Sequence, residues 1–133
     1  MWIELSNEKA VDEFLNSIAR FHDSCLSSFS YISGAYVDSN YSMYPLNDRR
    51  VLRMLFQRQF PEMTSFELEF YKLKHFCFVP TDDKYSCEIE YAELYIKDGL
   101  VFLEFPGLWR SGDREMTVLN SVCAAGCRWR DVT

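Results

Sequence analysis

The stretch from Phe66 to Phe105 constrains the fold of this chain more than any other, because it contains a clear hairpin signal. Asp98-Gly99 supplies the two residues that a type I′ turn needs at its positive-φ positions. Apolar residues lead up to this turn on both sides, as they do in paired strands. The sequence therefore predicts an antiparallel hairpin formed by Cys87–Lys97 and Leu100–Phe105.

The run from Phe66 to Val79, which precedes the hairpin, is also predicted to be a strand, but its alternation changes phase. The apolar residues first occupy even positions and then odd ones: Phe66, Leu68 and Phe70, followed by Leu73, Cys77 and Val79. A slip of one residue would turn the buried face outward, so we expect a bulge or bend at Tyr71-Lys72. Pro80 ends the strand because it has no amide hydrogen to donate.

The segment from Asn7 to Arg20 is the only one with a strong helical pattern. Ser6 or Asn7 can cap this helix, and Glu8 lies near its positively charged N-terminus. The apolar residues recur at helical spacing and form one stripe, which consists of Val11, Phe14, Leu15 and Ile18. We therefore expect an amphipathic helix at the start of the chain.

Two further strands are expected between this helix and Phe66. Cys25 to Val37 has a β-rich composition interrupted by Gly34, and residues 38–48 have the composition of a loop. Arg49 to Phe60 fits a strand or a helix, since its apolar residues share one face in either conformation. We interpret it as a strand, because it can then pair with Cys25–Val37, and strands that are neighbours in sequence usually pair.

The part of the chain after the hairpin is expected to form a loop and a last strand. Pro106 to Glu115 contains two glycines and is interpreted as the loop. Met116 to Val132 then returns to the sheet, and alternation predicts a buried face made of Cys123, Ala125, Cys127 and Trp129. The small residues on this face indicate a close neighbour, which we expect to be the helix.

Together these patterns predict an α+β fold in a single domain that covers residues 1–133. The N-terminal helix would pack on a largely antiparallel sheet of about five to seven strands. The apolar content of 48% and the aromatic content of 17% exclude a disordered chain and indicate a core rich in Phe and Tyr.

Charge and cysteine usage bear on the partners and the location of the protein. The net charge of −6 disfavours nucleic acid and anionic membranes as partners and favours a basic protein, with the alternative that the charge only keeps the protein in solution. No apolar run approaches the roughly 20 residues that span a bilayer, and the N-terminus lacks the pattern of a signal peptide. Five cysteines without a Cys-x-x-Cys pair indicate reduced thiols, so we expect a cytoplasmic protein.

The register of the predicted hairpin indicates a candidate site for a partner. A two-residue turn pairs Glu93 with Glu104 and Tyr95 with Phe102 across the two strands. Like charges that face each other destabilise a sheet unless solvent or a cation relieves them. These four residues are therefore a candidate contact surface for a basic side chain or a divalent cation, with a solvated acidic edge as the alternative.

Other combinations of chemically active residues are weaker. His22-Asp23 could provide a base or a metal ligand, or Asp23 or Ser24 could simply hydrogen-bond exposed backbone at the junction between helix and strand. Cys123 and Cys127 with His75 lack the paired spacing of a zinc site. The sequence contains no phosphate-binding loop and no nucleophile motif, so we expect no catalytic residues, no metal site and no cofactor.

Three segments together resemble a family of small uncharacterised bacterial proteins. They are residues 21–37 (FHDSCLSSFSYISGAYV), 42–60 (SMYPLNDRRVLRMLFQRQF) and 66–80 (FELEFYKLKHFCFVP). Members share a Phe-His-Asp-Ser start, a Met-Tyr-Pro loop and a closing strand with a Trp-Arg pair, here Trp129-Arg130. The resemblance implies an α+β domain with a largely antiparallel sheet and no known enzyme activity. Some similar small acidic proteins are encoded beside secreted toxins and look like immunity proteins.

Two functional hypotheses follow for this chain. The first is a non-catalytic binding protein, of the immunity type, that masks a basic toxin. The second is a small-ligand binder or an enzyme that uses His22, Asp23 and an acidic residue in a cleft. The sequence leaves the identity of the partner and the oligomeric state open.

Overall fold

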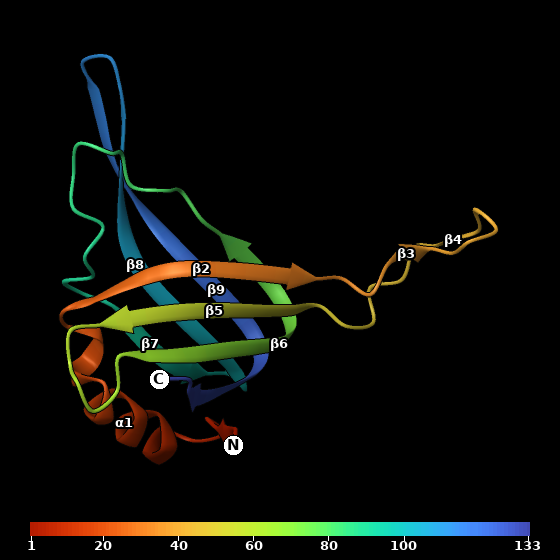
Figure 1. Cartoon of the computed structure of the whole chain (residues 1–133), viewed down its shortest axis with the longest axis horizontal. Coiled ribbons are helices and arrows are strands. Elements are labelled where there is room, and N and C mark those ends of the chain that lie inside the picture. Colours follow the sequence, from red (N-terminus) through yellow and green to blue (C-terminus); the bar gives the residue numbers. More distant parts are fainter.

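A twisted sheet dominates the computed structural model, which describes residues 1–133 (Figure 1). Six of its seven strands follow the order β2-β5-β6-β9-β8-β7, and β1 pairs with β9 outside this path. Every pairing is antiparallel. The strands are β1 (Ile3–Glu4), β2 (Ser24–Ile32), β5 (Val51–Arg58), β6 (Ser65–Cys77), β7 (Glu93–Lys97), β8 (Leu100–Ser111) and β9 (Arg114–Asp131). A separate two-stranded sheet joins β3 (Tyr36–Val37) and β4 (Met43–Tyr44).

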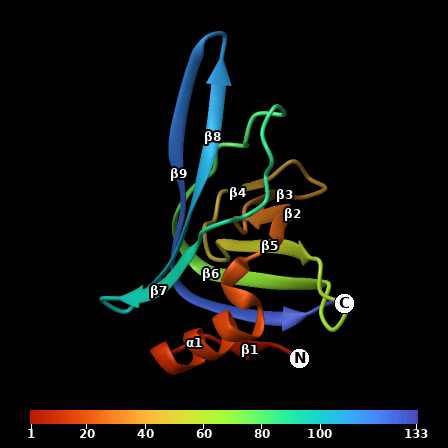
Figure 2. The same ribbon diagram turned by 90° about the vertical axis from the view of Figure 1, so that its left-hand side faces the viewer.

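The single α-helix, α1 (Glu8–Ser17), lies near the N-terminus and packs on this sheet (Figure 2). Asn7 caps the helix, because its side-chain oxygen accepts a hydrogen bond from the backbone N–H of Ala10 at 2.8 Å. The helix ends three residues before the predicted Arg20, since the chain enters left-handed conformations and forms the short 3₁₀ turn η1 (Ala19–Phe21). The structure therefore confirms the predicted α+β class, with a helix packed on a mostly antiparallel sheet.

The core between α1 and the sheet consists largely of aromatic side chains. Phe14 of α1 contacts Phe21, Phe66 and Trp129, with ring centroids 6.0, 5.8 and 5.0 Å away. Phe56 stacks on Phe66 at 5.3 Å. Phe14, Phe21, Phe56 and Phe66 are at most 1% exposed. Such pairs stabilise the fold by about 0.5–1.5 kcal/mol each beyond their buried area.

The ambiguous segment from Arg49 to Phe60 forms the strand β5, as we interpreted it. Leu52, Met54 and Phe56 alternate on the buried face of this strand, and each is fully buried. β5 pairs with β2 in the expected antiparallel manner. The helical alternative for this segment is therefore wrong.

The predicted change of phase in β6 is present. Lys72 adopts a φ of 51°, and the register between β6 and β9 shifts between Leu73 and His75. Before this point Phe70 is buried, and after it Leu73 packs against the same core. Phe76 and Phe78 then pack on the core, because the register shift between Leu73 and His75 returns the buried face to even positions. Cys77, which was predicted to be buried, is exposed, so the prediction is right for Leu73 and wrong for Cys77.

The last strand, β9, changes phase near the same point, which corrects part of its predicted buried face. The side chains that are buried or packed on the core are Val122, Ala124, Cys127 and Trp129. Ala125 is exposed and Cys123 is only half-buried, so the prediction is wrong for these two residues. Simple alternation fails here because β9 bends together with β6, its hydrogen-bonded neighbour.

The close neighbour of the small residues in β9 is a tyrosine ring and not the helix. A Cβ atom on Gly126 would lie 2.2 Å from the ring of Tyr71, so only glycine leaves room for this ring. The Tyr71 hydroxyl donates a hydrogen bond to Glu4 Oε2 at 2.7 Å. This hydrogen bond, together with burial, raises the pKa of Tyr71 to about 12.

The Asp98-Gly99 turn forms as predicted, with φ values of 54° and 76°. β7 begins at Glu93 instead of Cys87, because the preceding residues form part of a loop over the core. The predicted loop at 106–115 is wrong, since β8 continues to Ser111 and pairs with β9 across a turn at Gly112-Asp113. Pro106 is tolerated in β8 because β7 has already ended, so no strand pairs with that edge of β8 at Pro106.

The structure contains no helix whose length and hydropathy would let it cross a membrane.

Candidate binding surfaces

The predicted acidic site lies on the hairpin of β7 and β8. Glu93 pairs with Glu104, and Tyr95 pairs with Phe102, in the register that the turn implied. The rings of Tyr95 and Phe102 stack with centroids 5.1 Å apart. Tyr91 precedes the strand and is 57% exposed. We call these five residues the acidic face.

A tyrosine hydroxyl lies against each of the two opposed carboxylates. The Tyr95 hydroxyl donates a hydrogen bond to Glu104 Oε1 at 2.7 Å, and the Tyr91 hydroxyl donates one to Glu93 Oε1. The hydrogen bond to Glu104 raises the pKa of Tyr95 to about 12, and the hydrogen bond to Glu93 raises the pKa of Tyr91. Each carboxylate therefore accepts a hydrogen bond from one neutral donor.

Negative charge is concentrated around the acidic face. The segment 82–104 contains seven Asp and Glu residues against two Lys residues, whereas the rest of the chain is close to neutral. This segment therefore accounts for nearly all of the net charge of −6. Such a concentration produces a local field that attracts cations and basic surfaces.

A second surface, which the sequence did not predict, projects from the sheet between β2 and β5. Residues 33–50 leave the body of the protein and form a narrow hairpin that carries β3 and β4 (Figure 1). We call this segment the aromatic arm, because large apolar side chains lie exposed along it. They are Tyr36, Val37, Tyr41, Met43, Tyr44 and Leu46. Tyr41 is 91% exposed and Met43 is 70% exposed, so nothing in the chain covers the tip.

Local contacts give the aromatic arm a defined shape. Asp38 Oδ1 accepts hydrogen bonds from the backbone N–H groups of Asn40 and Ser42, at 2.9 and 3.0 Å. The rings of Tyr36 and Tyr44 stack across the two short strands with centroids 4.8 Å apart. The prediction of a plain loop at 38–48 is thus wrong in part. The signal that could have identified the arm was the number of aromatic residues between its Asn, Ser and Pro residues.

His22 and Asp23 lie at the junction between η1 and β2, and both side chains are exposed. Asp23 has a φ of 59°, and the Ser24 hydroxyl donates a 3.5 Å hydrogen bond to the backbone carbonyl of His22. Asp23 lines a shallow surface depression together with Glu88 and Arg58. His22 is not among the residues that line this depression. The structure therefore brings Asp23 close to an acidic residue, but it does not bring the imidazole to the same place.

The five cysteines are free thiols. Cys123 pairs with His75 across β9 and β6, whereas Cys127 is buried in the core, and burial raises its pKa well above the ordinary value. The three residues named as a weak metal candidate thus do not converge on one point. No group of three or more His, Cys, Asp or Glu side chains is arranged to hold a metal ion.

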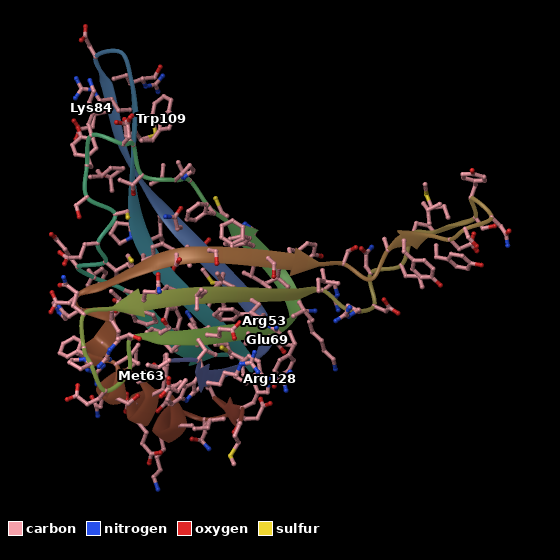
Figure 3. All side chains as sticks on the ribbon, viewed as in Figure 1. Arg53, Met63, Glu69, Lys84, Trp109 and Arg128 are labelled. Atoms are coloured by element: carbon pink, nitrogen blue, oxygen red, sulfur yellow. The ribbon has the colours of Figure 1, made fainter.

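The outer face of the sheet, opposite the core, carries a network of ion pairs. Arg53 and Arg128 each contact a different oxygen of Glu69 at 2.6 Å, and the three side chains lie together in Figure 3. Glu67 makes similar contacts with Arg130 at 2.9 Å and with Arg53 at 3.7 Å. The indole of Trp2 covers the network, with the three guanidinium carbons 4.3–5.5 Å from its ring centroid.

Glu69 is the most buried carboxylate of this network, at 4% exposure. Burial alone would raise its pKa, but the hydrogen bonds and charges of Arg53 and Arg128 outweigh this effect and lower the pKa. The network joins β5, β6 and β9 and fixes the N-terminal segment through Trp2. Its charges are therefore largely neutralised within the sheet.

Comparison of the chain with models of protein families, with curated proteins and with solved structures finds no match.

Proposed function

We propose that the protein is a non-catalytic binding module that captures a basic protein, in the manner of an immunity protein that masks a toxin. The observation that supports this most is the aromatic arm, whose exposed tyrosine and methionine side chains extend away from the core. Aromatic residues and methionine are enriched at protein interfaces, and exposed apolar clusters of this kind commonly mark contact sites.

The aromatic arm has the features of a binding element that is organised before it meets its partner. Stacking of Tyr36 on Tyr44 and the hydrogen bonds to Asp38 restrict the conformations of the free arm. A restricted element loses less entropy on binding than a flexible loop does. Full burial of a side chain such as Met43 would contribute about 1.5–3 kcal/mol to the affinity.

The acidic face determines which kind of partner approaches. Negative charge from the segment 82–104 attracts a basic surface over roughly 10 Å at an ionic strength of 0.1 M. Such steering mainly increases the rate of association and its dependence on salt. The partner that fits both surfaces is therefore a protein with a positively charged patch and an apolar groove that accepts the arm.

The aromatic arm can be tested with the double variant Tyr41→Ser/Met43→Ser. Wild-type and variant proteins would be used to capture partners from a lysate of the source cells, with quantification by mass spectrometry. The matched control is Met116→Ser/Leu119→Ser, which removes two exposed apolar side chains from the hairpin of β8 and β9. We expect wild type and control to capture the same amount of a basic protein, and we expect the arm variant not to capture it.

The acidic face can be tested on the captured partner with Glu93→Gln/Glu104→Gln. The control, Glu8→Gln/Glu13→Gln, removes the same charge from the exposed side of α1. We expect the first variant to bind more slowly and with a weaker dependence on salt than the control. Capture of no basic protein, or equal capture by the arm variant, would contradict the proposed function.

A further inference from the structure

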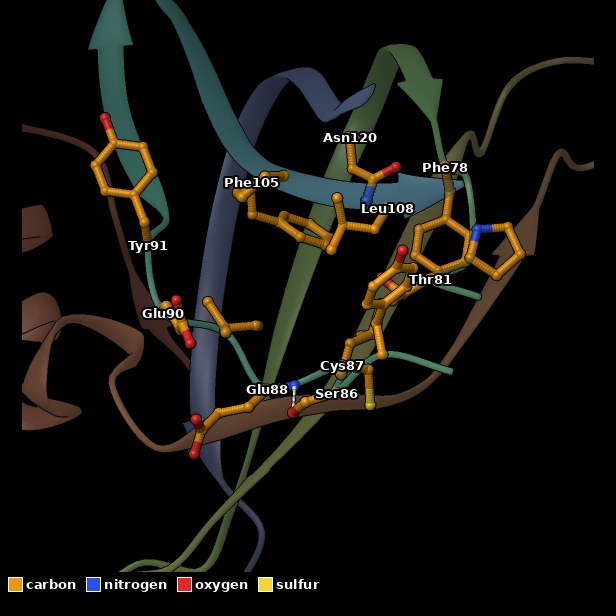
Figure 4. A pocket seen from close by; sticks show the side chains of 15 residues that line it. Phe78, Thr81, Ser86, Cys87, Glu88, Glu90, Tyr91, Phe105, Leu108 and Asn120 are labelled. Carbon is orange, nitrogen blue, oxygen red and sulfur yellow. Dashed lines mark hydrogen bonds between the residues drawn. The ribbon is translucent and has the colours of Figure 1, made fainter. Parts of the chain in front are cut away.

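A cavity of about 510 Å³ lies between the sheet and the segment that joins β6 to β7 (Figure 4). Leu26 of β2 lines one side, and Phe105 and Leu108 of β8 line another. The remaining wall comes from the connecting segment 78–91. Pockets that bind small molecules usually have volumes of about 300–1,000 Å³, so this cavity is of a suitable size.

The connecting segment is fixed in place, so the cavity is part of the folded structure. Ile89 pairs with Ser24 of β2, and its backbone N–H donates a 2.8 Å hydrogen bond to the Ser24 carbonyl. Asp82 N–H donates a 2.8 Å hydrogen bond to the carbonyl of Leu108 in β8. The Tyr85 hydroxyl donates one to Glu115 at 2.8 Å. These contacts attach the segment to β2, β8 and β9.

Asn120 is the polar residue that the cavity leaves incompletely paired. It is 2% exposed, and its Oδ1 accepts a hydrogen bond from the backbone N–H of Val79 at 2.7 Å. Its Nδ2 donates no hydrogen bond within the protein, and the side chain lies on the cavity wall in Figure 4. Gly107 leaves space beside this amide, since a Cβ atom there would lie 2.8 Å from Nδ2. Asn120 Nδ2 is not one of the fully buried unpaired atoms, so it keeps solvent access and can donate a hydrogen bond to an acceptor in the cavity.

The remaining lining defines the chemistry of the occupant. The apolar wall is formed by Leu26, Phe78, Pro80, Ile89, Phe105, Pro106 and Leu108. Glu88 and Glu90 also line the cavity and are exposed to solvent, so an anionic molecule would meet two negative charges. A carboxylate beside Asn120 would in addition lose its hydration in apolar surroundings.

We propose that this cavity binds a small, largely apolar molecule, neutral or cationic, whose carbonyl-type oxygen accepts a hydrogen bond from Asn120 Nδ2. The site is separate from the aromatic arm and does not depend on the proposed function. The apolar wall supplies most of the affinity, and Asn120 determines the orientation of the ligand.

The hydrogen bond is tested by changing the ligand, because Asn120 also holds Val79 and its replacement would disturb the fold. The probes are propiophenone and propylbenzene, which have the same carbon skeleton and differ in the ketone oxygen. Titrations would be followed by ¹⁵N–¹H correlation spectra of the wild-type protein, in which the Asn120 side-chain amide is visible. We expect both probes to shift lining residues and propiophenone to bind roughly three- to tenfold more tightly. Only propiophenone should move the Asn120 side-chain signal downfield.

Charge selectivity is tested with 3-phenylpropanoate, an anion of similar size, which should bind more weakly than either neutral probe. The position of the site is tested with Leu108→Trp, which fills the cavity, and with Leu119→Trp as a control on an exposed position of β9. Leu108→Trp should abolish the shifts and the control should retain them. If Leu108→Trp does not fold, Leu26→Phe takes its place as the filling variant.

Three results would overturn the proposal. The first is the absence of shifts at lining residues with either neutral probe, which would leave water as the only partner of Asn120 Nδ2. The second is equal affinity for propiophenone and propylbenzene. The third is unchanged binding by a folded variant in which the cavity is filled.

Discussion

Replacement of Glu69 by Gln tests whether the ion-pair network on the outer face of the sheet stabilises the protein. In the native structure one carboxylate accepts four hydrogen-bond or ion-pair contacts from two guanidinium groups. Arg53 Nε and Nη2 lie 3.1 and 2.6 Å from Oε2, and Arg128 Nε and Nη2 lie 2.9 and 2.6 Å from Oε1. The change therefore leaves two arginines beside a neutral amide, whose NH₂ group faces one of them.

The expected cost follows from burial on each side of the network. Loss of one partner from a fully buried ion pair costs about 3–5 kcal/mol. The side chains of Arg53 and Arg128 are 43% and 33% exposed, so water can replace part of what they lose. We expect Glu69→Gln to lower the free energy of unfolding by about 2–3 kcal/mol, between the buried-pair value and the small values of surface pairs.

Urea and thermal unfolding followed by circular dichroism would measure this cost. For a chain of this length each kcal/mol corresponds to roughly 3–5 °C in Tm, so the variant should melt about 6–15 °C lower. The control is Glu13→Gln, which breaks a 4.0 Å ion pair with Lys9 between side chains that are 69% and 85% exposed. This control should change stability by at most about 0.5 kcal/mol. If Glu69→Gln were as stable as the control, the network would contribute nothing and the reasoning would be refuted.

The same network makes the stability of the protein depend on pH, because the pKa of Glu69 is lowered in the folded state. Its contribution to stability is complete above the ordinary pKa of 4.5 and is lost as pH falls through the folded pKa. The difference in unfolding free energy between wild type and Glu69→Gln should therefore shrink at acid pH. At the alkaline end, the pKa values of Tyr71 and Tyr95 are raised from 10.0 to about 12. The stability that their neutral hydroxyls contribute is therefore complete below pH 10.0 and is lost as pH rises from there through about 12. Ultraviolet titration of the folded protein should show late ionising phenols, and Glu104→Gln should make Tyr95 ionise earlier; an unchanged titration curve would count against the hydrogen bond. Gly126→Ala places a methyl group 2.2 Å from the Tyr71 ring and should cost about 1–3 kcal/mol by urea unfolding, with a smaller cost in a Tyr71→Ala background; equal costs in both backgrounds would exclude this clash.

Local signals in the sequence determined the helix, the hairpin of β7 and β8, and the pair of opposed glutamates on it. Asn7 and the apolar stripe that follows it specify α1, because capping and amphipathic spacing act within a few residues of the chain. Asp98-Gly99 specifies a two-residue turn, and the length of this turn determines that Glu93 pairs with Glu104. In these cases the information lies within about twenty residues of where it acts, so a single sequence is enough.

The features that sequence reasoning missed depend on residues that are distant in the chain. The buried face of β9 changes phase because β6 bends beside it, and Gly126 is explained by the ring of Tyr71, which belongs to that other strand. β8 extends beyond Pro106 because β9 continues beside it, whereas its composition alone resembled a loop. Pairing across the sheet thus overrides the local preference of these residues.

The candidate binding sites divide in the same way. The sequence by itself determined four residues of the acidic face, since one turn decides which residues are opposed, whereas the contact of Tyr91 with Glu93 came from the structure. Only the tertiary structure placed the aromatic arm outside the core, because exposure depends on whether another element covers a segment. Likewise, only the fold brings Asn120 of β9 together with the segment 78–91 around one cavity, since these residues meet through the pairing of β9 with β6 and β8. The physical reason is that turns and helices form from neighbouring residues, whereas cavities and exposed surfaces arise from how distant elements pack.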